Sequence, residues 1–170
     1  MNPSHLFLQY STEKLRQLEG RIQICLADLT PQQVWARGGE SQNAAGNLVL
    51  HLCGNVSQWI LSGVGGRPDT RVRDAEFAAR GDVEVAELSR RLAETVFSAV
   101  DVLQALPIER LTDRIEVQKY DVSVLEAIYH VVEHFSQHTG QIIVLAKMAN
   151  GQDLGFYRHL QNLEHTEKIP

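Results

Sequence analysis

The sequence lacks the defining features of disulfide-rich, membrane-spanning and secreted proteins. It contains only two cysteines, Cys25 and Cys53, without a Cys-x-x-Cys spacing, which excludes a disulfide-stapled scaffold and favours a reducing, cytoplasmic location. No apolar run reaches the roughly 18 residues of a membrane span. The first ten residues lack the basic and apolar regions of a secretory signal. We therefore expect a cytoplasmic protein without a membrane partner.

Concentrated positive charge is also missing. The chain has 16 Lys and Arg residues against 21 Asp and Glu residues, which gives a formal net charge of -5. Proteins that bind nucleic acids gather basic residues on one surface to neutralise phosphates, so we expect no nucleic-acid partner. The 44% hydrophobic and 22% charged residues are typical of a globular protein. At 170 residues, we expect one domain over residues 1–170.

Apolar residues that recur every three or four positions predict four long helices. Their expected bounds are Ser4–Asp28 with Ser4 as N-cap, Asn43–Leu61 ending at Gly63, a third helix between its cap Asp82 and Pro107, and Ser123–Met148. The last begins with the capping box Ser123-Val-Leu-Glu126 and ends before Asn150-Gly151.

Four helices with one apolar face each favour an all-α, four-helix bundle. The charged segment between residues 67 and 80 is too long for a tight connection, so we predict a long crossover between the second and third helices. Alternating apolar residues predict a short extended piece within residues 114–122, and a short helix is expected within residues 156–170.

Three of the seven histidines, His130, His134 and His138, lie four residues apart on the predicted fourth helix. Each step of four residues turns the helix by only ~40°, so neighbours share a face and can offer two imidazoles to one metal ion. His130 and His138 are ~12 Å apart along the axis, too far for a shared ion with bonds of ~2.1 Å. His134 and His138 form the preferred pair, because His130 lies nearer the polar edge of the helix.

His51 is the candidate third ligand. It lies within the apolar pattern of the predicted second helix, where an unpaired imidazole costs roughly 1–3 kcal/mol. Three neutral imidazoles that leave coordination positions open are typical of a reactive metal site rather than a closed structural one. The alternative is a metal-free bundle, in which His51 is a hydrogen-bonded core residue and the four-residue spacing arises by chance.

Other polar residues are candidates for supporting roles. Candidates to hold the second ring nitrogen of a ligand are Asn47, Asn55, Gln137 and Gln141. Cys53 is excluded as a ligand, because a two-residue step turns it ~200° away from His51. The arginines available to hold substrate carboxylates are Arg67, Arg71 and Arg73, although arginines in such a segment more commonly belong to a solvated loop. Glu126 and Glu133 are candidate general bases, although surface ion pairs are more common.

Two motifs resemble those of the DinB-like (YfiT-like) metalloenzyme superfamily. They are Asn47-Leu-Val-Leu-His51-Leu-Cys-Gly-Asn55 followed by Gln58-Trp-Ile60, and His134-Phe-Ser-Gln-His138-Thr-Gly-Gln141. Arg73–Phe77 and Gly151–Tyr157 are similar to an uncharacterised branch of it. The resemblance implies a four-helix bundle with a divalent metal, zinc or nickel, at His51, His134 and His138. It also implies that this chain forms a homodimer, and that a low-molecular-weight thiol could be a cofactor, as in some relatives.

Two classes of function fit these observations. The first is a metal-dependent enzyme for a small-molecule substrate, either similar to the thiol transferases or a hydrolase, because a metal with open positions activates a thiol or a water. The second is a non-catalytic metal-binding or stress-associated interaction protein, in which the metal serves folding or sensing.

Overall fold

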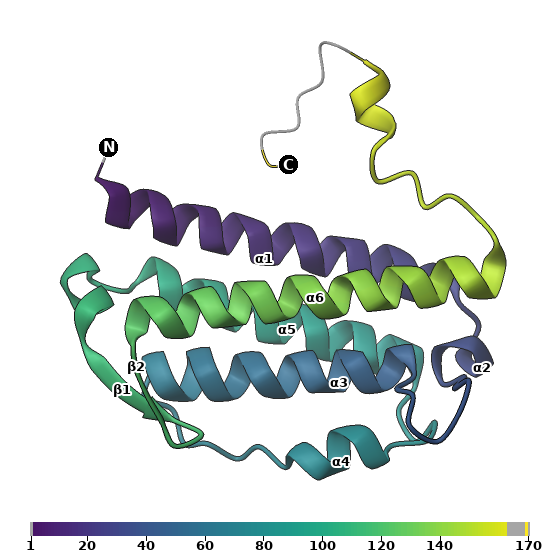
Figure 1. Cartoon of the computed structure of the whole chain (residues 1–170), viewed down its shortest axis with the longest axis horizontal. Helices are drawn as coiled ribbons and strands as arrows, with labels where there is room; N and C mark the ends of the chain where they lie inside the picture. The colour runs from purple at the N-terminus through teal and green to yellow at the C-terminus, as the bar shows by residue number, and fades with distance from the viewer. Residues whose placement is uncertain (1, 163–168, 170) are drawn as a thin grey trace.

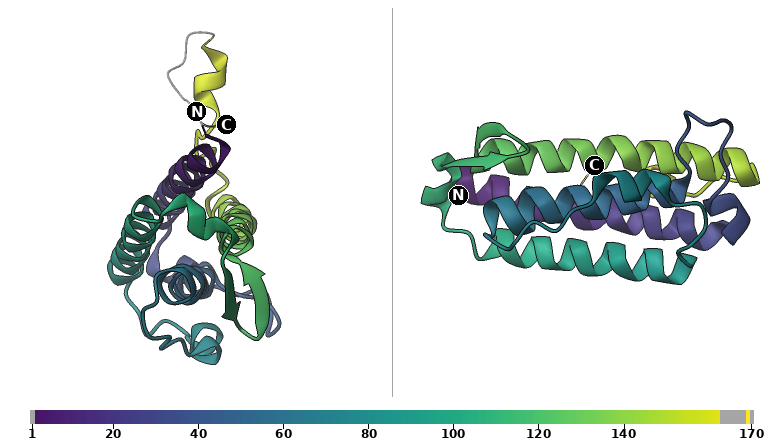
Figure 2. Two further views of the ribbon diagram at one scale, coloured as in Figure 1. Left: turned by 90° about the vertical axis from the view of Figure 1, so that its left-hand side faces the viewer. Right: turned by 90° about the horizontal axis from the view of Figure 1, so that it is seen from below.

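Four long helices build the protein (Figure 1). The computed structural model describes residues 2–162 and 169. The helices are α1 (Pro3–Asp28), α3 (Ala45–Val56) with its π-helical continuation η1 (Ser57–Val64), α5 (Val85–Gln104) and α6 (Val124–Asn150). The end-on view in Figure 2 shows the four helices surrounding one core. The predicted all-α bundle is confirmed, as is the long crossover that joins η1 to α5.

Short elements fill the connections. They are α2 (Pro31–Val34), α4 (Arg73–Ala78) within the crossover, and the 3-10 helices η2 (Ile108–Thr112) and η3 (Arg158–Gln161). The predicted extended piece is an antiparallel hairpin of β1 (Arg114–Val117) and β2 (Tyr120–Ser123). Its turn places Gln118 and Lys119 at φ of 52° and 66°, which is the backbone of a two-residue hairpin turn. The helix expected in the tail corresponds to η3 up to residue 161, and residues 163–168 and 170 lie outside the described part.

Several predicted helix ends are wrong by a few residues. Asn2, not Ser4, caps α1, because its side chain accepts the Ser4 N–H at 2.9 Å. The third long helix begins at Val85 with Glu84 as N-cap rather than at Asp82, and the second begins at Ala45. The fourth begins as predicted, with Ser123 and Glu126 bonded reciprocally, and ends at Gly151, whose φ is 65°.

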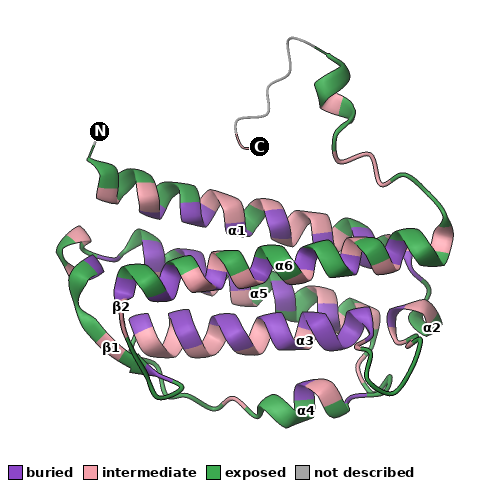
Figure 3. Ribbon diagram, viewed as in Figure 1, coloured by how far each residue is buried: buried purple, intermediate pink, exposed green. Residues whose placement is uncertain are grey.

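Apolar side chains from all four helices form the core, and the inward faces are buried in Figure 3. The largest fully buried side chains include Phe135, Leu15, Ile22, Leu52 and Leu92. Each contributes about 1.5–3 kcal/mol relative to an exposed position. His51 is 6% exposed, so the packing of α3 against α6 carries an imidazole into the interior of the protein.

The crossover is fastened to α3 by one asparagine. Asn47 Nδ2 donates to the backbone oxygens of Glu76 (2.9 Å) and Ala79 (3.0 Å), while its Oδ1 accepts from Arg37 Nη2. Arg37 Nη2 also donates to the Phe77 oxygen at 2.9 Å. These bonds place α4 beside α3, as Figure 1 shows. Among the described residues, no helix is long and apolar enough to cross a membrane.

Candidate metal centre

Three histidines converge between α3 and α6. His51 Nε2 lies 3.1 Å from His134 Nε2, and His138 Nε2 also lies 3.1 Å from His134 Nε2. One ring nitrogen from each of the three lies within 4.8 Å of the others. Two nitrogens that share one ion through bonds of ~2.1 Å are at most ~4.2 Å apart. The two separations of 3.1 Å from His134 Nε2 meet this limit, and the 4.8 Å that bounds the third pair exceeds it by about 0.6 Å. The folded chain thus gathers the three residues that the spacing selected.

His130 lies beside this cluster rather than in it. Its ring is 4.4 Å from that of Trp59 and 5.6 Å from that of His134, measured between ring centroids. Within the described residues, it does not join the group of side chains that are close enough to share an ion. The helical rise between His130 and His138 accounts for the separation.

The outer nitrogens of two histidines are held by acceptors. His51 Nδ1 lies 2.9 Å from Glu76 Oε2, and His138 Nδ1 lies 2.7 Å from Gln141 Oε1. A carboxylate and an amide oxygen accept hydrogen bonds but donate none, so these contacts place the proton of each ring on Nδ1. Arg71 Nη2 also lies 3.1 Å from His51 Nδ1, but it already donates to Glu76 Oε2 at 2.9 Å, so the carboxylate decides the tautomer of His51. In the neutral ring the Nε2 lone pair is then free. Both lone pairs point toward His134, in the tautomer that metal-binding histidines adopt.

The third histidine leaves a polar atom without a partner in either tautomer. His134 Nδ1 is buried and has no hydrogen-bond partner. If Nδ1 carries the proton, a buried donor is unpaired and three lone pairs face one another. If Nε2 carries it, the one proton can serve only one of the two neighbouring rings. A cation between the Nε2 atoms relieves the conflict among the lone pairs, so the donor set fits a divalent transition metal.

The electrostatics keep the rings of His134 and His138 in the neutral form that binds metals. Burial, followed by the neighbouring charges of His138 and His51, lowers the pKa of His134 from its ordinary value of 6.5 to about 3. Burial also lowers the pKa of His138. Both imidazoles are therefore unprotonated near neutral pH, and no proton must leave them before a metal can bind.

The depressed pKa values predict how the metal-free protein responds to acid. Below pH 6.5, His134 and His138 bind protons in the unfolded chain but stay unprotonated in the folded protein. The free energy of unfolding should therefore fall as pH decreases from 6.5 toward 3. Each proton contributes a slope of up to about 1.4 kcal/mol per pH unit. Urea unfolding in a chelator between pH 7 and pH 5 measures the slope, which should be shallower in His134→Gln. Equal slopes in both proteins would contradict this electrostatic account.

An ion pair from the crossover supports His51. Arg71 donates to Glu76 through Nε at 2.7 Å and through Nη2 at 2.9 Å, and the side chains are only 3% and 9% exposed. Burial raises the pKa of Glu76, but hydrogen bonds from Arg71 and His51 and the charge of Arg71 outweigh it, so the pKa is lowered overall. Glu76 is therefore an ionised acceptor for the His51 N–H. The expectation that Arg71 belongs to a solvated loop is wrong.

A missing side chain makes room for this contact. Gly54 lies three residues after His51 on α3, and a Cβ placed on it would overlap Glu76 Oε1 and stand 2.8 Å from Arg71 Nε. Any other residue at this position would push the carboxylate away from the helix. Neither Glu76 nor Gly54 was selected as a site residue from the sequence. The only local sign of this contact in the sequence is Gly54 itself, a glycine within a helix one turn after the core histidine His51.

The remaining candidates have other roles. Gln141 holds His138 as predicted, whereas Asn47 anchors the crossover instead of orienting an imidazole. Asn55 is buried with its Oδ1 unpaired, and Gln137 is exposed. Among the candidate bases, Glu126 is bonded to Ser123 at the start of α6, and Glu133 is exposed. Arg67 and Arg73 are exposed, and Arg73 lies over the ring of Phe77, 5.0 Å from its centroid.

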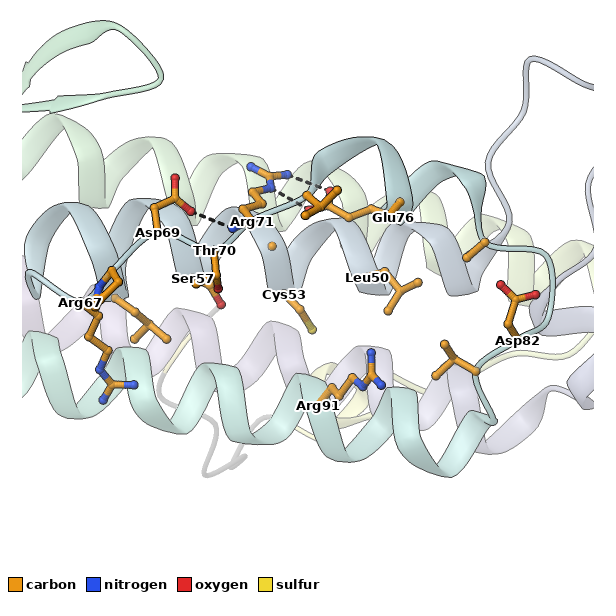
Figure 4. A pocket seen from close by; sticks show the side chains of 17 residues that line it. Leu50, Cys53, Ser57, Arg67, Asp69, Thr70, Arg71, Glu76, Asp82 and Arg91 are labelled. Atoms are coloured by element: carbon orange, nitrogen blue, oxygen red, sulfur yellow. Dashed lines mark hydrogen bonds and ion pairs between the residues drawn. The ribbon is translucent and has the colours of Figure 1, made fainter.

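A cavity of about 560 Å³ lies behind the ion pair, between α3, the crossover and α5 (Figure 4). Arg71 and Glu76 form part of its wall, and none of the three histidines does. Cys53 faces this cavity and is half-buried. Burial of the thiol raises the pKa of Cys53 to about 12, which keeps it protonated and unreactive at neutral pH.

Comparisons with known proteins agree with this fold. Residues 2–158 match the family described as "Protein of unknown function (DUF1572)". A conserved protein from Enterococcus faecalis superposes with a TM-score of 0.70 at 18% identity, covering 89% of this chain and 99% of that one. A DinB-like protein from Bacillus cereus gives 0.64 at 20% identity, covering 84% and 90%. No protein of curated function matches the chain.

Proposed function

The chain belongs to the DUF1572 family and has the DinB-like fold, and on that premise we propose that it binds one divalent metal ion through His51, His134 and His138. The observation that carries the proposal is the convergence of three Nε2 atoms, two of whose rings have Nδ1 bonded to an acceptor. The proposal extends to a metal-dependent reaction of a small molecule, because three protein ligands leave coordination positions open for water or substrate.

The ligand chemistry favours zinc or nickel. Imidazole nitrogens of intermediate softness suit late first-row divalent ions, whereas calcium and magnesium prefer oxygen ligands. All three ligands are neutral, and the described carboxylate nearest the rings, Glu76, is engaged by Arg71 and His51. The bound ion would therefore keep most of its positive charge, which favours an anionic fourth ligand such as hydroxide or thiolate.

Such an ion supplies one kind of chemistry, a lowered pKa of a bound water or thiol that makes it a nucleophile near neutral pH. The protein's own residues fix the ligands. Glu76 holds His51 in the Nδ1–H tautomer, Gln141 does the same for His138, and Arg71 keeps Glu76 ionised. A hydrolase would use the water, and a thiol transferase would use a low-molecular-weight thiol.

The catalytic half of the proposal is tested with one preparation in three metal states. Zinc-loaded, nickel-loaded and metal-stripped protein are assayed for ester and amide hydrolysis, and for transfer of small thiols such as cysteine to 1-chloro-2,4-dinitrobenzene. We expect turnover that requires metal and is absent in His138→Ala. A protein that holds stoichiometric metal but turns over none of these substrates in any state would favour the non-catalytic alternative.

A further inference from the structure

An open groove lies next to the histidines on the side away from the hairpin. It has a volume of about 680 Å³ and is bounded by α6, by Leu48 of α3 and by residues 41–43 of the preceding loop. Figure 2 shows the loop between α2 and α3 rising beside the C-terminal half of α6. The volume is within the range of small-molecule pockets, about 300–1,000 Å³.

The groove begins one helical turn from the candidate metal on both helices. Leu48 lies three residues before His51, and Gln141 lies three residues after His138. Gln141 belongs to both structures, because its side chain lines the groove while its Oε1 accepts from His138 Nδ1 at 2.7 Å. None of the three histidines lines the groove, so Gln141 is its link to the cluster. A molecule whose reacting group reaches the three Nε2 atoms would extend past Gln141 to place its remainder in this groove.

The lining carries no ionisable side chain among the described residues. Its apolar surface comes from Leu48, Leu145 and Val144, the last 55% exposed, and its polar groups are amides and one hydroxyl. A charged group entering here would lose hydration without gaining a counter-charge, which is unfavourable. The cavity in Figure 4 is different, because arginines and carboxylates line it.

We infer that this groove binds an uncharged, largely apolar portion of the substrate, such as an alkyl, acyl or aryl group. This inference rests on the proposed metal centre, which would engage the reacting group. It names the substrate class by chemistry: a small molecule with one metal-binding end and one neutral, apolar end.

Alkyl hydroxamates test both ends separately, because the hydroxamate group chelates zinc and the chain projects from it. Zinc-loaded protein is titrated calorimetrically with acetohydroxamate, octanohydroxamate and the monohydroxamate of suberic acid, whose chain has the same length but ends in a carboxylate. We expect octanohydroxamate to bind roughly 10–100-fold more tightly than acetohydroxamate, because apolar surface is buried. The suberic compound should lose most of that gain.

A glycine in the groove allows a matched variant. Gly140 lines the groove on α6, and a Cβ there meets nothing within 4 Å. Leucine is also the better helix former, so Gly140→Leu should fold and fill the groove. It should abolish the gain of octanohydroxamate while leaving acetohydroxamate binding unchanged. Gly20→Leu is the control, because a Cβ at Gly20 on α1 also meets nothing within 4 Å.

Three results would overturn the inference. The first is equal binding of the octano and suberic compounds, and the second is an unchanged chain-length gain in Gly140→Leu. The third is a dimer that Gly140→Leu converts to a monomer, measured by light scattering, since a second copy would then cover the groove.

Failure of the metal centre would give a different result. Acetohydroxamate would not bind, and the groove would then be tested in metal-free protein with the neutral fluorophore N-phenyl-1-naphthylamine. Displacement by 1-octanol but not octanoate, lost in Gly140→Leu, would support the groove on its own. No binding of the fluorophore, or equal displacement by both, would count against it.

Discussion

Replacing His51 or His138 with alanine is expected to weaken zinc binding by roughly 100- to 1,000-fold. Four-ligand zinc sites contribute an apparent 10–16 kcal/mol, so each ligand carries about 2.5–4 kcal/mol. The three Nε2 atoms have no described fourth side chain that is placed to replace a lost ligand. Competition titration against a chromophoric chelator measures the affinity, and nickel should show a loss in the same direction.

His130→Ala is the matched control for these variants. It removes the same side chain from the same helix, one turn before His134, but its ring packs against Trp59 rather than joining the cluster. Its zinc affinity should stay within about threefold of the original protein, since a residue outside the ligand set changes binding only indirectly. A loss as large as that of His138→Ala would mean that the ligand set includes His130.

Removing the Glu76 carboxylate should produce the largest loss of stability. The Arg71 side chain is only 3% exposed in the original protein. Glu76→Ala leaves its guanidinium without a counter-charge and leaves the His51 N–H without an acceptor. Breaking a buried ion pair from one side costs about 3–5 kcal/mol, because an uncompensated charge remains. Urea unfolding of the metal-free protein measures the change. A loss below about 1 kcal/mol would show that Arg71 finds another partner or reaches solvent.

Two milder variants separate the charge of Glu76 from its position. Glu76→Gln keeps the size but removes the charge, and Gly54→Ala keeps the carboxylate but adds the Cβ that overlaps Oε1. Both should lower zinc affinity about 10–100-fold, the usual effect of losing the partner of a metal-binding histidine. Gly20→Ala on α1 is the control for the added methyl. An unchanged zinc affinity in Gly54→Ala would contradict the role assigned to the crossover.

The helices were predictable because their information is local. Apolar periodicity placed all four, and the reciprocal bonds of Ser123 and Glu126 fixed the start of α6. The stop expected at Gly63 is wrong, because the helix continues as η1 to Val64. A Cβ on Gly63 would stand 2.6 Å from Val117 Cγ2 of the hairpin. The glycine therefore serves a close contact with β1, which no local pattern reveals.

In the candidate site, too, the local features were predictable from the sequence and the long-range contacts were not. The four-residue spacing of His134 and His138 expresses helix geometry, so sequence alone selected the pair. The Glu76–His51 contact joins residues 25 positions apart. It forms because Asn47 holds the crossover against α3 while Gly54 leaves room for the carboxylate. Asn47 was assigned to the wrong partner for this reason. Its position one turn before His51 could not show that its amide reaches backbone oxygens of α4.

The metal content of the purified, untagged protein tests the central claim most directly. Elemental mass spectrometry is applied to the original protein, to His51→Ala and to His138→Ala, each before and after reconstitution with zinc or nickel. We expect close to one divalent ion per chain in the original protein and a small fraction of that in both variants. An original protein that holds no metal even after reconstitution, or variants that retain as much as the original, would contradict the three-histidine centre.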